Sequence, residues 1–272
     1  MSASKPFLKW AGGKHKLVPF ITAHLPPQRS GRLIEPFAGS AALTLATDYD
    51  AYLINDTNPD LITLYTILKQ EKQGFIDYAR HYFIPDNNEE NRYYVLREQF
   101  NDSQDPAERA ALFIYLNRHA FNGLCRYNSK GGYNVPFGRY RAPYFPEKEM
   151  QAYLGKAGRI ELSCGDFRDA LAQATDDDTI YCDPPYVPLS DTASFTAYHK
   201  DSFNRDEQQR LADSARIIAP RTRGILISNH DTAYTRALYH DARLATVHVQ
   251  RNIAASGASR QKVGEILAIY AP

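Results

Sequence analysis

The strongest constraint on the fold of this chain is the alternation of short apolar stretches with longer helical ones. The apolar stretches read, in order, GRLIEPFAGS, YLIND, RIELSC, TIYC and GILIS. Stretches with helical character, such as AALTLATD and NRDEQQRLADSARII, lie between and after them. Alternating helices and apolar strands predict a largely parallel, doubly wound α/β sheet.

Two regions depart from this alternation. Near the end, LATVHVQRNI and EILAIYAP read as two strands joined by a loop with Gly and Ser, which predicts a C-terminal antiparallel hairpin. Residues 59–149 read as a mainly helical insertion, in which Asp105 and Pro106 suit the cap and the first residue of one helix. We therefore expect one α/β domain built from residues 1–58 and 150–272 and interrupted by that insertion.

The cysteines and the apolar runs limit the class of protein. Cys125, Cys164 and Cys182 are odd in number and not spaced C-x-x-C, which favours reduced cytoplasmic thiols over a disulfide frame or a zinc site. No apolar run approaches the roughly 20 residues of a membrane span, and MSASKPFLKW lacks the apolar segment of a signal peptide. The 8 histidines form no metal-like cluster. We therefore expect no membrane span and no bound metal.

The net charge of +1 hides an uneven distribution. Residues 109–146 contain six Lys or Arg, no Asp or Glu, and nine interleaved aromatic residues. A second basic run without acids spans residues 251–262. Because Lys and Arg attract phosphates, the first stretch predicts a nucleic-acid-binding surface. The alternative is a solvated basic face over an aromatic core, and Phe113 and Tyr115 fit that core because they lie on a helix.

The strand TIYC is followed by Asp183, Pro184, Pro185 and Tyr186. Ligands of open α/β sheets bind beyond the carboxyl ends of the strands, and a residue before proline is held extended. The Asp183 carboxylate and the Pro184 carbonyl would then be two acceptors facing one pocket, which suits an exocyclic amino group. Tyr186 offers a flat face on which an extruded base can stack. An ordinary turn after a strand explains the same residues.

The first two predicted strands end in groups that suit a cofactor. Gly39 follows the first strand, where the backbone turns tightly beside a ligand, and Asp56 ends the second, where an acid meets ribose hydroxyls. Glu35 is either a solvated acid at a strand end or part of the same site. Gly13-Lys14 is not a phosphate loop, because the required earlier glycine and the following Ser or Thr are missing.

Together these motifs resemble the Dam-type DNA adenine methyltransferases. The motifs FLKWAGGKHKL, IEPFAGS, YLNRHAFNGLCRYN, YNVPFGRY, DPPY and ISNHD occur in the family's order over almost the whole chain. The resemblance implies a Rossmann-like class I methyltransferase sheet with a DNA-recognition insertion. It also implies base flipping and transfer of a methyl group from S-adenosylmethionine to adenine N6 in duplex DNA, at GATC. We expect a bacterial or phage protein, monomeric in solution.

The resemblance assigns roles to individual residues. The catalytic set is Asp183, Pro184, Pro185 and Tyr186. The set for S-adenosylmethionine is Trp10, Lys14, Glu35, Phe37, Gly39, Asp56 and Asp183. The set for DNA is Lys9, Arg118, Phe121, Asn122, Leu124, Arg126, Asn128 and Arg139. Within these sets, Trp10 and Lys14 close over the methionine end of the cofactor. Arg126 reads guanine and Leu124 contacts a base, whereas Arg118, Asn122, Asn128 and Arg139 either contact phosphates or cap loops.

Several positions leave alternatives open. Ala41 replaces the family's second glycine, which predicts a looser approach to the cofactor, and Phe121 replaces a tyrosine, keeping the ring without its hydroxyl. Asn229 and His230 either line the pocket or are satisfied polar groups at a strand end. Residues 189–199, after the catalytic motif, predict a lid over the flipped base.

Two other function classes compete with this interpretation. The first is a methyltransferase that acts on RNA or on a protein amide nitrogen, against which Asp183 and the basic insertion argue. The second is a methyltransferase fold that only binds DNA, against which Lys14, Asp56 and Asp183 argue. A zinc deaminase is excluded, because its P-C-x-x-C motif is absent.

Overall fold

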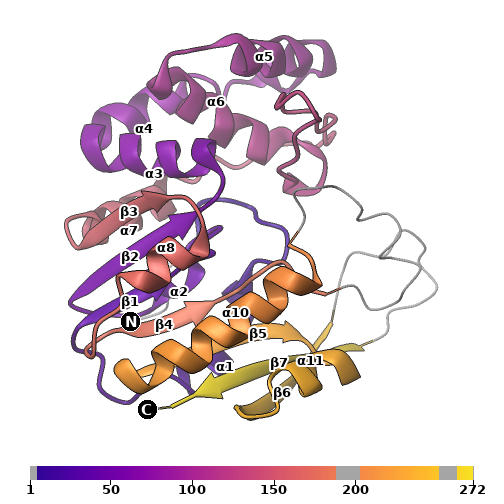
Figure 1. Ribbon diagram of the computed structural model, residues 1–272. Coiled ribbons are helices and arrows are strands. Elements are labelled where there is room, and N and C mark those ends of the chain that lie inside the picture. The colour runs from indigo at the N-terminus through magenta and orange to yellow at the C-terminus, as the bar shows by residue number, and fades with distance from the viewer. Residues whose placement is uncertain (1–4, 188–202, 251–261, 272) are drawn as a thin grey trace.

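The computed structural model of the chain describes residues 5–187, 203–250 and 262–271. Within these residues the centre is a seven-stranded sheet with the order β3-β2-β1-β4-β5-β7-β6 (Figure 1). The strands are β1 (Arg32–Glu35), β2 (Ala51–Asp56), β3 (Ile160–Cys164), β4 (Thr179–Cys182), β5 (Gly224–His230), β6 (Arg243–Gln250) and β7 (Lys262–Tyr270). Neighbours among β1 to β5 run parallel, whereas β7 runs antiparallel to β5 and β6. This arrangement confirms the predicted sheet and its C-terminal hairpin.

Helices cover both faces of the sheet (Figure 1). The helices outside the insertion are α1 (Val18–Thr22), α2 (Ala42–Ala46), α7 (Glu147–Ala157), α8 (Phe167–Ala172), α10 (Arg205–Ile218) and α11 (Ala233–Leu238). Buried residues of α8, α10 and α11 share one apolar cluster with β4 and β5, and those of α2 and α7 belong to a second cluster. Because both faces are covered, β4 and β5 are buried along their whole length, which explains their continuous apolar sequences.

The insertion between β2 and α7 is mainly helical, as predicted. Its helices are α3 (Pro59–Glu71), α4 (Gln73–Arg80), α5 (Glu90–Asp102) and α6 (Pro106–His119), and they lie beyond the β3 edge of the sheet (Figure 1). Short 3-10 turns include η1 (Lys14–Leu17), η2 (Pro85–Asn88), η3 (Phe121–Gly123) and η5 (Ala219–Arg221). Buried side chains of α3 and α6 join the apolar cluster that contains Leu33 of β1 and Tyr52 of β2. The insertion therefore shares a core with the sheet.

Polar caps begin the insertion's main helices. The Asn58 side chain accepts hydrogen bonds from the backbone N–H groups of Asp60 and Leu61 at the start of α3. The Asp105 side chain accepts one from Ala107, and Pro106 is the first residue of α6, as the sequence predicts. Asn58 matters further, because it lies two residues after the end of β2.

The parallel strands bring several acids to one edge of the sheet. Glu35 ends β1, Asp56 ends β2, and Asp183 follows the last residue of β4. β1 pairs with both β2 and β4, so these three carboxyl ends are adjacent. Ligands of such sheets bind at this edge.

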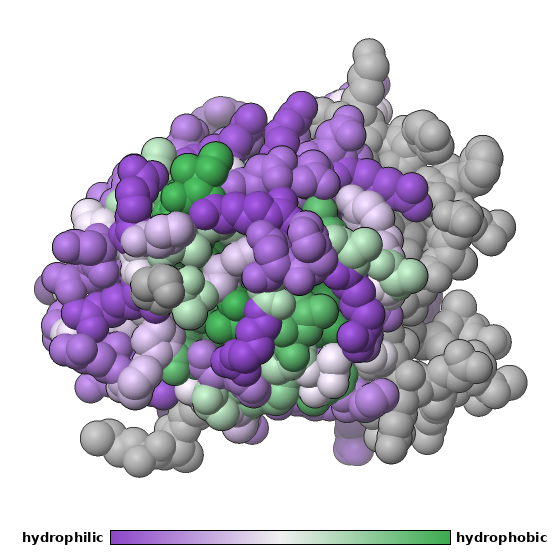
Figure 2. Space-filling model, turned by 60° about the horizontal axis from the view of Figure 1, so that its bottom comes forward, coloured by the Kyte–Doolittle hydropathy of each residue, from purple (hydrophilic) through white to green (hydrophobic). Residues whose placement is uncertain are grey.

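The opposite end of the sheet carries a separate hollow of about 350 Å³. Apolar residues from the segment after α1 and from β5 and β7 line it together with two arginines; they include Leu25, Pro26, Leu226 and Ile269. Figure 2 views the molecule from below and shows a largely hydrophilic face on which apolar residues gather near the centre. The hollow lies at the start of β5, so it is not part of the edge that bears Asp183.

Two predictions fall outside the described residues. These are the lid at residues 189–199 and the basic run from residue 251, apart from its last member. Across the described ranges, no helix is both long and apolar enough to cross a bilayer.

Candidate active site

Side chains from α10 and β5 hold the loop that follows Asp183. Gln208 Nε2 donates a hydrogen bond of 2.7 Å to the Pro185 carbonyl. His230 Nδ1 donates one of 2.6 Å to the Val187 carbonyl, and Asn229 Oδ1 accepts from the Val187 N–H at 3.4 Å. Asn229 and His230 are buried and hydrogen-bond to the backbone of this loop. This supports the interpretation that they are satisfied polar groups at a strand end.

Asp183 forms an ion pair with a buried lysine. Lys14 Nζ lies 2.8 Å from Asp183 Oδ1 and donates a hydrogen bond of 2.6 Å to the Gly12 carbonyl. Burial raises the pKa of Asp183, and the Lys14 ammonium opposes that rise. Among the described residues no group donates to the Pro184 carbonyl, so this carbonyl is an acceptor left beside the Asp183 carboxylate at the end of β4.

Tyr186 is fixed at both its hydroxyl and its ring. The hydroxyl donates a hydrogen bond of 2.9 Å to Glu265 Oε2 on β7. The ring meets His230 edge to face, with centroids 4.8 Å apart, and Lys14 Nζ lies 4.5 Å from the ring centroid. The half-buried ring therefore keeps one orientation beside Asp183.

The loop after β1 is shaped around Gly39. Its φ of +48° lies in the left-handed region, and a Cβ there would lie 2.6 Å from Trp10 Nε1. Its N–H donates a hydrogen bond of 2.9 Å to Asp56 Oδ2. The other Asp56 oxygen accepts from the Asn58 N–H at 3.0 Å. Only glycine fits this position, because a larger residue would displace the indole ring.

Glu35 is a buried acid, which excludes the solvated alternative. Its side chain accepts a hydrogen bond of 2.7 Å from the Thr44 N–H of α2, and the residue is 3% exposed. Burial raises the pKa of Glu35 to about 7; the bonds from Thr44 oppose this rise, and the negative charge of Asp183 adds to it.

Rings and a strained residue complete this edge. Phe37 stacks on Phe167 with centroids 5.2 Å apart and meets Phe203 edge to face at 5.3 Å.

Ala41 has φ 52° and ψ 40°, the left-handed region in which glycine is unstrained. The conformation explains why a glycine suits this position, and an alanine here costs roughly 1–2 kcal/mol of backbone strain.

On the side of the insertion, α6 holds the N-terminal segment. The buried Asn117 accepts a hydrogen bond of 2.8 Å from the Lys9 N–H and donates one of 2.6 Å to the Lys9 carbonyl. Arg118 is also buried, and its guanidinium donates to the Phe7 carbonyl. Lys9 Nζ lies 3.9 Å from the Tyr140 ring centroid. Arg118 thus holds the backbone in this structure and is covered from solvent.

The segment after α6 exposes the other predicted recognition residues. Phe121 is 50% exposed, Asn122 is exposed with φ 55°, and Leu124 is half-buried. The exposed Arg126 donates through Nε to Asn134 Oδ1 at 2.7 Å.

Asn128 and Arg139 both have partners within the protein. Asn128 Oδ1 accepts from the N–H groups of Lys130 at 2.9 Å and Gly132 at 3.0 Å, so Asn128 caps a turn. Arg139 lies 2.8 Å from Glu90 of α5 with its side chain 73% exposed. Such an exposed ion pair contributes little stability and can be exchanged for another anion.

Acids from other helices offset part of the basic stretch. Besides Glu90, Asp60 of α3 pairs with Arg109 at 2.7 Å. Within the described part of the chain, Lys130 and Arg141 form no ion pair. The positive charge of this surface therefore comes from fewer residues than the sequence suggests.

Three supporting residues were not singled out from the sequence. They are Gln208, Glu265 and Asn117, each far from its partner along the chain. No local signal marks Gln208 or Glu265, since a polar residue on a helix or a strand is ordinary, whereas Asn117 lies within the motif YLNRHAFNGLCRYN. In the described residues, no three His, Cys, Asp or Glu are grouped so that they could hold a metal ion.

Known proteins resemble this chain over its whole length. The profile of the D12 class N6 adenine-specific DNA methyltransferases matches residues 10–253. A DNA adenine methylase of Vibrio cholerae serotype O1 is 50% identical over 274 residues, covering 100% of this chain and 98% of that protein. The DNA adenine methylase of Escherichia coli K12 is 48% identical, covering 100% and 97%. Among solved structures, a human methyltransferase 10 domain containing protein covers 97% of this chain and 81% of its own, with a TM-score of 0.42 and 8% identity.

Proposed function

Because this chain belongs to the D12 class of N6 adenine-specific DNA methyltransferases, we propose that it methylates adenine N6 within GATC in duplex DNA, with S-adenosylmethionine as methyl donor. The observation that supports this best is the pair of acceptors at the end of β4. The Asp183 carboxylate and the Pro184 carbonyl stand beside the Tyr186 ring on a loop that Gln208, Asn229 and His230 hold rigid.

The residues at the edge of the sheet fit S-adenosylmethionine. Gly39 leaves room where a Cβ would strike Trp10, so the backbone can approach a ligand closely. Asp56 has both oxygens bonded to backbone N–H groups, and a carboxylate keeps further lone pairs for ribose hydroxyls. Phe37 offers a ring beside this loop, and Glu35 stands at the end of β1. When bound, S-adenosylmethionine supplies a methyl group on a sulfonium, which is electrophilic.

The chain's own residues prepare the adenine. Asp183 and the Pro184 carbonyl accept the two N–H bonds of the amino group, which draws the nitrogen towards a tetrahedral shape and directs its lone pair outwards. With S-adenosylmethionine bound, N6 would take its methyl group as the methyl–sulfur bond breaks and leaves a neutral thioether; the nitrogen would then lose one proton to water, so no strong base acts first. Lys14 occupies Asp183 Oδ1, so the amino group uses the other oxygen or displaces the ammonium. Positioning supplies most of the rate enhancement.

The insertion, residues 59–149, is proposed as the DNA-recognition region. The exposed Phe121 ring wedges into the base stack while the adenine leaves it, and Tyr186 receives the flipped base. Arg126 reads a guanine edge in the major groove, and Leu124 makes an apolar base contact. Lys9, whose backbone is bonded to Asn117 of α6, reaches from the N-terminal segment towards the DNA. We further propose a monomer in the bacterial cytoplasm, bound to DNA.

The experiment is a methylation assay on short duplexes. Duplexes with one GATC, with single-base variants of it, or with its adenine already methylated at N6 are incubated with protein and S-adenosylmethionine. N6-methyladenine is measured by mass spectrometry, and nucleases that respond differently to GATC methylation locate it. Methylation confined to intact GATC supports the proposal. Methylation of another base, or equal methylation of all duplexes, contradicts it.

A further inference from the structure

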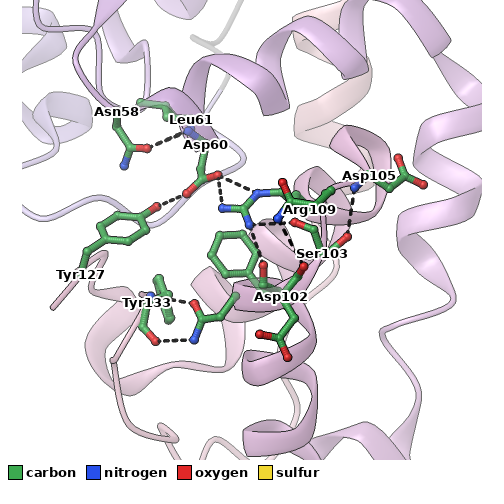
Figure 3. A network of polar contacts seen from close by, with 12 residues as sticks. Asn58, Asp60, Leu61, Asp102, Ser103, Asp105, Arg109, Tyr127 and Tyr133 are labelled. Atoms are coloured by element: carbon green, nitrogen blue, oxygen red, sulfur yellow. Dashed lines mark hydrogen bonds and ion pairs between the residues drawn. The ribbon is translucent and has the colours of Figure 1, made fainter. Parts of the chain in front are cut away.

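Asp60 joins three parts of the chain at the start of α3 (Figure 3). Its Oδ1 accepts hydrogen bonds from Arg109 of α6, at 2.7 Å from Nη2 and 3.2 Å from Nε. Its Oδ2 accepts a hydrogen bond of 2.7 Å from the Tyr127 hydroxyl, in the segment after η3. The Asp60 side chain is 13% exposed. A carboxylate that is largely removed from water and bonded on both oxygens holds its partners in one arrangement.

Tyr127 in turn sets the direction of Arg126. Tyr127 forms an isolated antiparallel bridge with Tyr133, so the chain is extended there. Neighbouring side chains of an extended chain point to opposite sides. Tyr127 is turned inwards to Asp60, and Arg126 is exposed, with its guanidinium held by the side chain and the carbonyl of Asn134.

The same helix start is attached to the cofactor edge of the sheet. The Asn58 N–H bonds to Asp56, and the Asn58 side chain caps α3 by accepting from the Asp60 N–H at 3.0 Å. The other end of that amide, Nδ2, donates to Cys125 Sγ at 3.5 Å. Two side chains of one helix turn, Asn58 and Asp60, thus contact the segment that carries Arg126, four residues or fewer after Asp56.

We propose that Asp60 and Tyr127 are positioning residues that determine the sequence specificity of methylation. Their contact fixes the Arg126 guanidinium relative to the base that enters the catalytic loop. A fixed guanidinium cannot adjust to a wrong base, whereas a loosened one can, so losing the contact reduces discrimination more than turnover. The inference rests on the proposed function, in which Arg126 reads guanine.

The test removes only the contact. Tyr127→Phe deletes the hydroxyl that bonds the Asp60 carboxylate, and its matched control is Tyr153→Phe, which deletes a buried hydroxyl that is bonded instead to the Tyr65 carbonyl. For both variants kcat and KM are measured on GATC duplexes and on duplexes with its guanine replaced. Tyr127→Phe is expected to lower the ratio of kcat/KM between the two duplexes about tenfold, within the range of one bidentate base contact. Its kcat on GATC stays close to that of the wild type, and Tyr153→Phe keeps the wild-type ratio.

A double-mutant cycle shows whether the effect passes through Asp60. Asp60→Ala lowers the ratio as Tyr127→Phe does, and combining the two lowers it no further. Asp60→Asn keeps the volume and an oxygen that accepts from Tyr127, so it retains most of the discrimination. A wild-type ratio in Tyr127→Phe, or additive effects in the cycle, overturns the inference while the wild type still methylates GATC. A wild type that methylates no adenine contradicts the proposed function instead.

Discussion

Lys14 and Asp183 form an ion pair of 2.8 Å between the N-terminal segment and the loop after β4. Lys14 is 7% exposed, so its charge acts on Asp183 with little screening by solvent. Lys14 therefore affects the charge of Asp183, the proposed acceptor of the amino group, and determines which of its oxygens is accessible. The same lysine also contacts the neighbouring Tyr186 ring.

Asp183→Ala is expected to lower kcat on GATC duplexes by roughly 10²-fold or more, because the lost acceptor acts at the reacting nitrogen. The fold is retained, as circular dichroism will show. Asp213→Ala, which removes an exposed acid of α10, serves as the control. A folded Asp183→Ala variant with near wild-type kcat would show that this carboxylate does not hold the amino group.

Lys14→Met is expected to shift the pH dependence of methylation. Asp183 accepts as a carboxylate, so activity is lost as the pH falls through its pKa. Lys14 lowers the pKa of Asp183 from the raised value that burial causes, and removing the ammonium raises it further. The loss of activity therefore begins at a higher pH in the variant. The profile of kcat/KM against pH measures this shift, with Lys16→Met, an exposed neighbour, as the control. An acid limb that stays in place contradicts the expectation.

Glu35→Gln is expected to remove a pH dependence of stability. The pKa of Glu35 rises from 4.5 to about 7, so the folded protein keeps a proton that the unfolded chain releases over this interval. The free energy of unfolding then falls as the pH rises from 4.5 to about 7, by roughly 3 kcal/mol from this group. Urea denaturation of the wild type and of Glu35→Gln, at pH 4.5 and at about pH 7, gives the difference between their free energies of unfolding at each pH. A difference that is the same at both ends would refute the raised pKa.

Arg126→Ala and Arg139→Ala are expected to have different effects on DNA recognition. Arg126→Ala removes the proposed guanine reader, and Arg139→Ala removes a proposed phosphate contact. Loss of a guanine reader costs about 1–3 kcal/mol at one base pair and relaxes discrimination there. Loss of a phosphate contact weakens all duplexes alike and lowers the salt slope by about one unit. Assays on GATC and its variants at several salt concentrations separate the two.

Glu90→Gln is the control for Arg139. It frees Arg139 from its ion pair, so it is expected to strengthen binding to every duplex.

If Arg126→Ala loses activity equally on every duplex, Arg126 contacts the DNA backbone and another residue reads the guanine.

Ala41→Gly is expected to leave the free energy of unfolding unchanged or to raise it, because glycine relieves the strain at φ 52° and offsets its own entropic cost of about 0.5–1 kcal/mol. The neighbouring Ala42→Gly, in the first turn of α2, is expected to lower it by about 1 kcal/mol. Both alanines are buried, so the pair is matched. Equal destabilisation in urea would show that Ala41 is unstrained.

The sheet was predictable because its signal is local. β4 and β5 are buried along their whole length and β1 and β2 over most of theirs, so these strands read as apolar runs, whereas β3 at the edge of the sheet is partly exposed. The carboxyl ends of the parallel strands share one edge. From this, the meeting of Glu35, Asp56 and Asp183 at one edge follows without further information. The family resemblance added the order of the motifs and the proposed role of Asp183 in methyl transfer, and the full-length matches confirm the family.

Contacts between distant segments could not be predicted in the same way. The acid-free stretch 109–146 reads as strongly basic, yet Asp60 and Glu90 from other helices pair with two of its arginines. A charge count along the chain cannot include partners that the fold supplies. Gln208 and Glu265 were missed for the same reason, since each meets the loop that follows Asp183 only after the sheet has formed.

Trp10 is the single tryptophan of the chain, and its indole ring lies against Gly39, at the edge of the sheet that is proposed to bind the cofactor. Indole emission depends on the polarity and the quenching groups around the ring. Fluorescence excited selectively from tryptophan therefore reports on this one place in the protein, with no label attached. Titration with S-adenosylmethionine should change that emission, and stopped-flow mixing would time the change. The occupancy of the cofactor loop can thus be followed separately from the methyl transfer itself.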